Sequence, residues 1–153
     1  MMHKEPTMLK RSTGVTLMEL MITVAIVAIL AAIAIPGYNQ YSTRGHRTEG
    51  AMALTQIAAR QEQFYLQNNT YANALGDLGF ATAESEHGRY ALAITTGNAT
   101  NFVARATAQG GQTDDDDCTV LAINEDGLRY GGPGPVGATI NMGTHNEECW
   151  RGR

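Results

Sequence analysis

The sequence VTLMELMITVAIVAILAAIAI, residues 15–35, is apolar at nearly every position and carries a single charge, on Glu19. At a helical rise of about 1.5 Å per residue this stretch would be about 31 Å long, which matches the roughly 30 Å hydrocarbon core of a bilayer. Residues 1–14 before it carry three basic side chains and one acidic one. A basic segment followed by an apolar one is typical of exported proteins. Together with their length, this pattern predicts that residues 15–35 can span a membrane.

Three interpretations of residues 15–35 remain open on composition alone. A cleaved secretory signal would have a shorter apolar stretch, of about 7 to 15 residues, before its cleavage site. A plain membrane anchor fits the length, although a carboxylate costs about 2.5 to 3.5 kcal/mol at the bilayer centre. A buried core helix would need apolar sequence around it on all sides, and so small a protein offers little of it.

Glu19 needs an explanation, because an acid inside an apolar segment is a candidate functional group. No basic side chain lies within one helical turn of it in the sequence. Cleavage after Gly14 would give Val15 a new amino group, four residues before Glu19 and on the same face of a helix. The helix would then carry one positive end and one negative side chain. These could neutralise each other or the same groups of a neighbouring copy.

The residues around this position resemble the processing site of type IV prepilins: Lys10-Arg11-Ser12-Thr13-Gly14, then Val15-Thr16-Leu17-Met18-Glu19-Leu20. The family pattern is a short basic leader that ends in glycine, then a hydrophobic residue, with a glutamate at the fifth mature position. The resemblance implies that residues 1–14 are a leader peptide, that prepilin peptidase cuts between Gly14 and Val15, and that Val15 is N-methylated. It also implies that Glu19 pairs with the amino terminus of an adjacent subunit.

Pro36 and Gly37 follow the apolar stretch directly. Proline removes a backbone hydrogen bond, so the pair either ends the membrane helix or kinks a longer one. Residues 44–66 then have an amphipathic helical pattern, in which Arg47 and Glu49 fall mostly off the apolar face. That face comprises Leu54, Ile57, Ala58, Gln61, Phe64 and Tyr65. The resemblance to type IV pilins favours a kink at Pro36 within one helix over residues 15–67.

Residues 68–153 are predicted to form a globular head. Residues 69–87 contain glycines and many small side chains and predict a loop with at most one short turn. Strand patterns follow at residues 89–95, 102–108 and 119–124, and a weaker fourth begins at Leu128, after the hairpin signal Asp126-Gly127. The pattern predicts an α+β fold, in which an antiparallel sheet of three to four strands packs on the C-terminal half of the long helix. The resemblance implies the same arrangement, the pilin fold.

Cys118 and Cys149 can form one disulfide or remain free thiols. A head on the far side of the membrane would lie in an oxidising compartment, which favours the disulfide. The segment between them includes Gly131-Gly132-Pro133-Gly134-Pro135, which can hardly form a core. Similarity to PilE-like type IVa pilins, in residues 112–118 and in Cys149-Trp150, implies a C-terminal loop bounded by this disulfide.

Other chemistry is only weakly indicated. Residues 114–117 are four consecutive aspartates, which lack the spacing of a calcium loop and are interpreted as an acidic surface turn. The four histidines are isolated from one another in the sequence, and no nucleophile, phosphate or dinucleotide motif is present. The sequence therefore predicts no enzyme activity, no metal site and no cofactor.

The charge balance bears on the partners of the chain. Its 11 lysines and arginines against 15 aspartates and glutamates give a net charge of −4, which disfavours a general nucleic-acid binder. Loss of residues 1–14 would leave 8 basic and 14 acidic side chains. The remaining route to DNA is a local basic stripe through Arg89, Arg105, Arg129 and Arg151.

The resemblance implies a structural function. The chain would be inserted in the inner membrane with a periplasmic head, then assembled into an extracellular helical pilus for adhesion, twitching motility or DNA uptake. Its partners would be other pilin subunits, prepilin peptidase, the inner-membrane assembly platform and, before assembly, membrane lipid. Two alternatives are a pseudopilin of type II secretion, which the cysteine pair and Cys149-Trp150 disfavour, and a minor pilin that acts as a DNA receptor.

Overall fold

The computed structural model describes residues 14–133 and 146–151. They belong to two compact units, which divide between Gly37 and Tyr38. Of the expected leader only Gly14 is among the described residues, so residues 1–13 lie outside them. Residues 134–145 of the expected C-terminal loop also lie outside the described ranges.

Helix α1, Leu17–Asn68, is 52 residues long and contains Pro36. Because the chain is helical on both sides of Pro36, the alternative in which Pro36 and Gly37 end the helix is wrong. Thr16 caps the start, since its Oγ1 accepts a hydrogen bond from the Glu19 N–H at 3.2 Å, as an N-cap threonine does. After the last turn Asn69 has a φ of 53°, the left-handed conformation that commonly ends helices.

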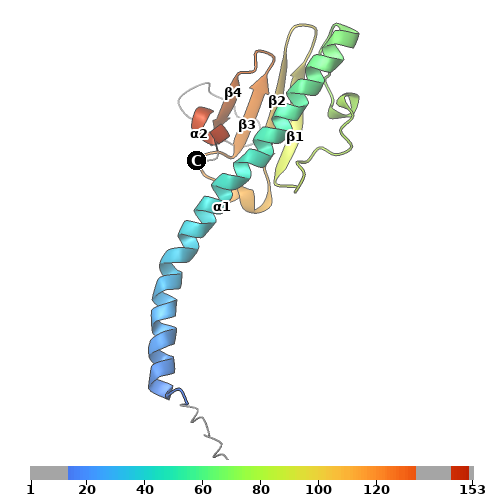
Figure 1. Ribbon diagram of the computed structural model, residues 1–153. Helices are drawn as coiled ribbons and strands as arrows, with labels where there is room; N and C mark the ends of the chain where they lie inside the picture. Colours follow the sequence, from blue (N-terminus) through green and yellow to red (C-terminus); the bar gives the residue numbers. More distant parts are fainter. Residues whose placement is uncertain (1–13, 134–145, 152–153) are drawn as a thin grey trace, which may run out of the picture. The chain divides into compact units, whose positions relative to one another are not determined.

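In the head, α1 lies across one face of a four-stranded antiparallel sheet (Figure 1). The strands run in the order β1-β2-β3-β4, so each pairs with the next along the chain. Their bounds are β1 Tyr90–Gly97, β2 Phe102–Ala108, β3 Val120–Asn124 and β4 Arg129–Gly132. The predicted α+β fold is therefore confirmed, including the weaker fourth strand.

The core lies between α1 and the sheet. Leu54, Ile57 and Gln61 of α1 are fully buried, which confirms the centre of the predicted stripe. Gly50 lets the helix approach the sheet closely. A side chain at this position would be crowded, because its Cβ would lie 3.1 Å from the Leu121 side chain. The sheet contributes the buried side chains of Tyr90, Leu92, Phe102, Ala104, Ala106, Leu121 and Ile123.

The described part of the head also contains three short helices. These are the 3-10 helices η1, Leu75–Leu78, and η2, Gly110–Asp114, and the helix α2, Asn146–Arg151. The segment after α1 is held by Gln61, whose amide exchanges two hydrogen bonds of 2.8 and 2.9 Å with the backbone of Ala72. The Asp-Gly signal is also confirmed, because Gly127 has a φ of 71° in the hairpin between β3 and β4, as this loop type requires.

Candidate functional site

The first unit presents a continuous apolar surface. Every residue from 14 to 35 is exposed except Ala31, which is partly exposed. Leu17 and Ile33 have exposed fractions of 78% and 72%. Among the described residues, one helix, α1, is both long enough and apolar enough to cross a membrane. Exposed apolar surface of this extent indicates a site of contact with lipid or with other proteins.

Glu19 lies in the first turn of α1, and its side chain is exposed. A carboxylate at this end of a helix interacts favourably with the partial positive charge of the helix N-terminus. Thr16 and Glu19 also have the spacing of a capping box, in which the threonine accepts from the backbone N–H of the glutamate. This role of Thr16 was not predicted from the sequence, although the Thr-x-x-Glu spacing signals it.

Gly14 and Val15 precede α1 and are not helical. Val15 has an exposed fraction of 70%, and a Cβ on Gly14 would meet no atom of the described residues within 4 Å. The peptide bond between them is therefore accessible in this structure. It also follows that no packing within the described residues requires a glycine at position 14.

Cys118 and Cys149 form a disulfide with a Cα–Cα distance of 5.6 Å. The bond ties α2 to the start of β3, and both cysteines are buried. The disulfide fits because residue 131 of β4 is a glycine. The Cβ of any larger residue there would clash with the Cβ of Cys149, at 2.5 Å. The predicted pairing is confirmed.

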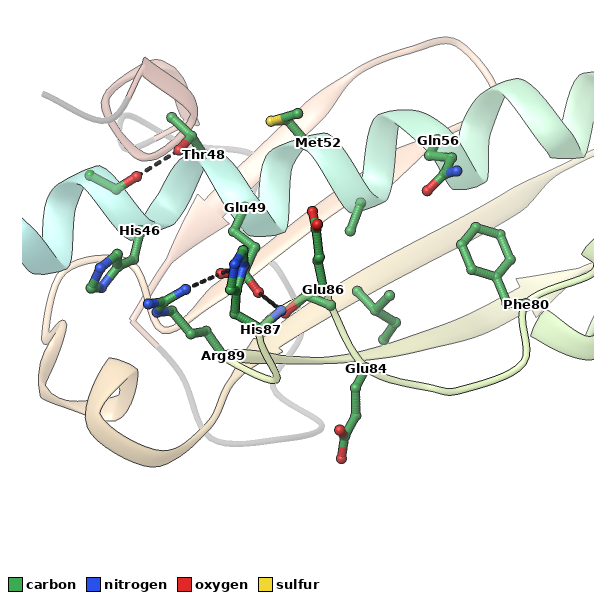
Figure 2. A pocket seen from close by; sticks show the side chains of 14 residues that line it. His46, Thr48, Glu49, Met52, Gln56, Phe80, Glu84, Glu86, His87 and Arg89 are labelled. Atoms are coloured by element: carbon green, nitrogen blue, oxygen red, sulfur yellow. Dashed lines mark hydrogen bonds and ion pairs between the residues drawn. The ribbon is translucent and has the colours of Figure 1, made fainter.

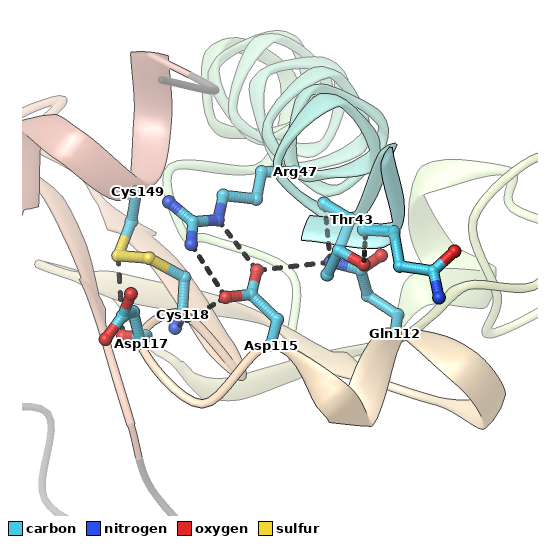
Figure 3. A network of polar contacts seen from close by, with 8 residues as sticks. Thr43, Arg47, Gln112, Asp115, Asp117, Cys118 and Cys149 are labelled. Atoms are coloured by element: carbon cyan, nitrogen blue, oxygen red, sulfur yellow. Dashed lines mark hydrogen bonds and ion pairs between the residues drawn. A yellow bond between two sulfur atoms is a disulfide. The ribbon is translucent and has the colours of Figure 1, made fainter. Parts of the chain in front are cut away.

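A buried ion pair joins α1 to the aspartate run (Figure 3). The guanidinium of Arg47 donates two hydrogen bonds of 2.7 Å to the carboxylate of Asp115, and the side chains are 4% and 3% exposed. The hydrogen bond with Asp115 raises the pKa of Arg47, although burial acts in the opposite direction. Asp115 also accepts from the backbone N–H of Cys118 at 3.3 Å, and Gln112 donates to the Thr43 carbonyl at 3.1 Å.

This ion pair corrects two predictions. Arg47 was expected off the buried face of the helix, and the aspartate run was interpreted as an acidic surface turn. Asp114, Asp116 and Asp117 are indeed exposed, but Asp115 is buried and acts as the acceptor for Arg47. The sequence gives no sign of the pairing, because the partners are 68 residues apart.

Glu49 is the centre of a second polar cluster, beside a cleft of about 730 Å³ between α1 and the loop before β1 (Figure 2). Its carboxylate accepts hydrogen bonds from the Ser85 hydroxyl, from the His87 N–H at 2.9 Å and from Arg89 at 2.7 Å. Burial acts to raise the pKa of Glu49, but these hydrogen bonds outweigh it and lower the pKa to about 2. Among the described side chains no group of three or more potential ligands is placed to hold a metal ion.

The arginines considered for DNA contact do not form one stripe. Arg105 pairs across the sheet with Ala122, which pairs with Tyr130, so these three side chains share one face. Arg129, next to Tyr130 in β4, therefore faces the other side. There its guanidinium lies 5.1 Å from the Trp150 ring, and Arg89 binds Glu49 elsewhere. Arg105 and Arg129 therefore cannot belong to one stripe, because strand neighbours alternate between faces.

Comparison with known proteins shows two family matches. Residues 9–35 match the family described as "Prokaryotic N-terminal methylation motif". Residues 36–122, more than half of the chain, match the family described as "Type IV minor pilin ComP, DNA uptake sequence receptor".

Three relatives are described as type IV major pilin or fimbrial proteins. The type IV major pilin protein PilA of Myxococcus xanthus is 34% identical over 88 residues, which are 58% of this chain and 40% of PilA. PilE of Neisseria gonorrhoeae is 33% identical over 56% of this chain and 51% of PilE. The match thus spans about half or less of these two proteins. FimA of Dichelobacter nodosus is 35% identical over 115 residues, 74% of this chain and 68% of FimA. The extent of these matches establishes that the chain belongs to the type IV pilins.

Proposed function

We propose that this pilin is made as a prepilin in the inner membrane and becomes the subunit of a helical pilus. Prepilin peptidase cuts it between Gly14 and Val15, Val15 is N-methylated, and the assembly platform moves the chain from the membrane into the filament. The observation that carries this proposal is the nearly complete exposure of the apolar residues 17–35 together with one acid, Glu19.

Exposed apolar residues must be covered by something other than water. Full burial of one large apolar side chain gains about 1.5 to 3 kcal/mol relative to water. Membrane lipid covers them before assembly, and other copies of the same helix cover them in a filament. Lipid is as apolar as these side chains, so transfer to the filament gains little from the hydrophobic effect itself. The free energy that favours the filament over lipid must therefore come from helix packing and from polar groups.

Glu19 is the polar group that distinguishes the two environments. In lipid its carboxylate has no cation of its own chain within one helical turn before cleavage, and a charge there is costly. Cleavage provides the amino group of Val15, and in a bundle each Glu19 can pair with the amino group of an adjacent copy. Pairing of this kind is heterologous, since it joins different surfaces of two subunits, and it extends into an open helical filament.

Gly14 supports the assigned cleavage position. Apart from its neighbours in the chain, none of the described residues lies within 4 Å of its Cβ position, so packing among them does not select glycine there. Selection by the binding pocket of a peptidase gives a physical reason for the residue.

The test is the amino terminus of the mature chain. Mass spectrometry of protein from sheared filaments should give a chain that begins with N-methylated Val15. Gly14→Leu should leave the leader attached, whereas Gly37→Ala, also at a position without close neighbours, should be cut normally. A mature chain that begins elsewhere, or normal cutting of Gly14→Leu, would overturn the proposal.

DNA reception is the second candidate function, and the match of residues 36–122 to the DNA-uptake-sequence receptor family favours it. The charge of the head opposes high affinity, because residues 38–153 contain 8 basic and 13 acidic side chains. Such a protein neutralises few phosphates, so it should have a shallow dependence of affinity on salt. Binding of this kind would have to rely on base contacts more than on phosphate contacts.

A gel-shift titration of the detergent-solubilised chain separates the two candidates. A receptor should retain duplex DNA that carries its uptake sequence and release a scrambled duplex of the same composition. Equal retention of both duplexes, or of neither, would exclude sequence-specific reception and leave the filament function alone.

A further inference from the structure

Two tyrosines at the start of the head are largely exposed. Tyr38 and Tyr41 have exposed fractions of 71% and 79%. They lie three residues apart on α1 and therefore on one face of the helix. Each combines a large apolar ring with a polar hydroxyl.

The other tyrosines of the chain are used in packing. Tyr90 and Tyr130 are buried. Tyr65 stacks on Tyr71 with a centroid distance of 4.6 Å, and Tyr71 in turn packs against Phe102 at 5.0 Å. The head thus buries or stacks four of its six tyrosines and leaves two adjacent ones in solvent.

The position of the exposed pair along α1 coincides with the edge of a bilayer. If residues 15–35 fill the hydrocarbon core of about 30 Å, the headgroup layer beyond them is about 5 to 7 Å thick. At about 1.5 Å per residue, Tyr38 lies about 4.5 Å past Ile35 and Tyr41 about 9 Å past it. Tyr38 would lie within this layer. The backbone of Tyr41 would lie just beyond it, and its ring would reach back to the outer edge, because side chains on a helix tilt toward the N-terminus.

We propose that Tyr38 and Tyr41 form an interfacial anchor, which binds the phospholipid headgroup layer on the side of the membrane where the head lies. Tyrosine is enriched at this depth because its ring and hydroxyl suit the boundary between hydrocarbon and water. Arg44, one further turn along α1 and only partly exposed, adds a cation that can reach lipid phosphates. The anchor fixes the depth of the apolar helix before assembly.

This inference rests on the proposed membrane insertion of the prepilin, so its test must separate the two. The full chain is reconstituted in phosphatidylcholine vesicles that carry bromine atoms either close to the headgroups or deep in the acyl chains. Bromine quenches tryptophan fluorescence at short range and so reports depth. Three variants add one tryptophan each: Ile29→Trp in the apolar stretch, Tyr38→Trp in the proposed anchor, and Leu66→Trp in the head. Trp150 remains in all of them, and its signal in the unaltered chain is subtracted.

The expected pattern is specific. Ile29→Trp should be quenched most by the deep bromines, Tyr38→Trp most by the bromines near the headgroups, and Leu66→Trp, 82% exposed in the head, by neither. An unquenched Ile29→Trp would overturn membrane insertion and the anchor with it. A quenched Ile29→Trp with an unquenched or deeply quenched Tyr38→Trp would overturn the anchor alone.

A second measurement asks whether the pair sets the depth. Tyr38→Ser with Tyr41→Ser is added to the Ile29→Trp chain, and Leu66→Ser is added to a matched control. Loss of the anchor should let the helix sample more depths, so the ratio of deep to shallow quenching should fall toward one, while the control keeps its ratio. An unchanged ratio together with reduced filament yield would overturn the proposal and assign the tyrosines to contact with a second copy.

Discussion

The two parts of α1 have the same backbone structure and opposite surroundings. Residues 17–35 are almost entirely apolar and almost entirely exposed. Residues 47–61 contain several polar side chains, yet they include the buried Arg47, Leu54, Ile57 and Gln61. Hydrophobicity alone therefore does not tell which part of this helix packs within the subunit. What decides is whether the chain provides a surface to cover it, and the sheet does so only for the second part.

The polar side chains of the two parts of α1 also differ in where their partners lie. In the head, the buried side chain of Arg47 has a partner from a distant segment, Asp115. In the apolar part, Glu19 remains exposed. Its expected partner is an amino group on another subunit. The first kind of pair stabilises the subunit, and the second kind would stabilise only the assembly.

Filament formation should depend most on the acid of the apolar part. Glu19→Ala should leave cleavage and N-methylation intact, because the Gly14–Val15 site is unchanged, but should reduce the filament yield at least about tenfold, which corresponds to about 1.4 kcal/mol. The yield is measured in sheared fractions and the processing by mass spectrometry. Glu62→Ala, an exposed acid on the head part of α1, is the control. Wild-type filament yield from Glu19→Ala would refute the distinction between the two parts.

The head should respond to loss of a buried partner instead. Asp115→Ala leaves the Arg47 guanidinium buried and unpaired, so the free energy of unfolding should fall by about 3 to 5 kcal/mol. Urea titration of the full chain in detergent measures it. Asp116→Ala removes the exposed neighbour in the same run and should cost less than about 0.5 kcal/mol. Similar losses in the two variants would show that burial of Asp115 does not matter.

Two adjacent glycines test the packing around the disulfide. Gly131→Ala would place a Cβ 2.5 Å from the Cβ of Cys149, whereas a Cβ on Gly132 would meet no atom of the described residues within 4 Å. Overpacking of this kind costs about 1 to 3 kcal/mol, so Gly131→Ala should lower the unfolding temperature and Gly132→Ala should change it much less. The opposite order of the two variants would contradict the packing described for α2.

The smallest effect concerns pH. Hydrogen bonds lower the pKa of Glu49 from 4.5 to about 2 in the folded head. A carboxylate whose pKa is lower in the folded state than in the unfolded state stabilises the fold at any pH above the unfolded-state pKa. This stabilisation is lost as the pH falls from about 4.5 to 2. The difference in stability between the unaltered chain and Glu49→Gln should therefore narrow over that range. Glu86→Gln, at an exposed site, should show no such narrowing; a constant difference for Glu49→Gln would exclude the assigned role of the hydrogen bonds.

The elements of the fold could be predicted because their signals are local. The alternation in residues 102–108 predicted β2 with its observed bounds, and Asp126-Gly127 placed the last hairpin because a glycine suits its left-handed turn. Helix α1 starts two residues after the predicted position, at Leu17, where Thr16 caps it, and ends one residue after the predicted position, at Asn68. The amphipathic stripe failed at Arg47, whose burial depends on a residue outside the helix. It also failed at Glu49, whose side chain is only 12% exposed because it binds residues of the loop before β1.

The sequence by itself determined that residues 15–35 contain the apolar first part of a helix, with one acid, and that a small α+β head with two cysteines follows. Hydrophobic periodicity and turn residues act over a few positions, so they can be read without coordinates. Only the tertiary structure decided which of four aspartates is buried, that Glu49 binds Ser85, His87 and Arg89, and that Arg105 and Arg129 lie on opposite faces. These facts depend on contacts between segments far apart in the chain, and on strand register, in which a shift of one residue exchanges the two faces of a sheet.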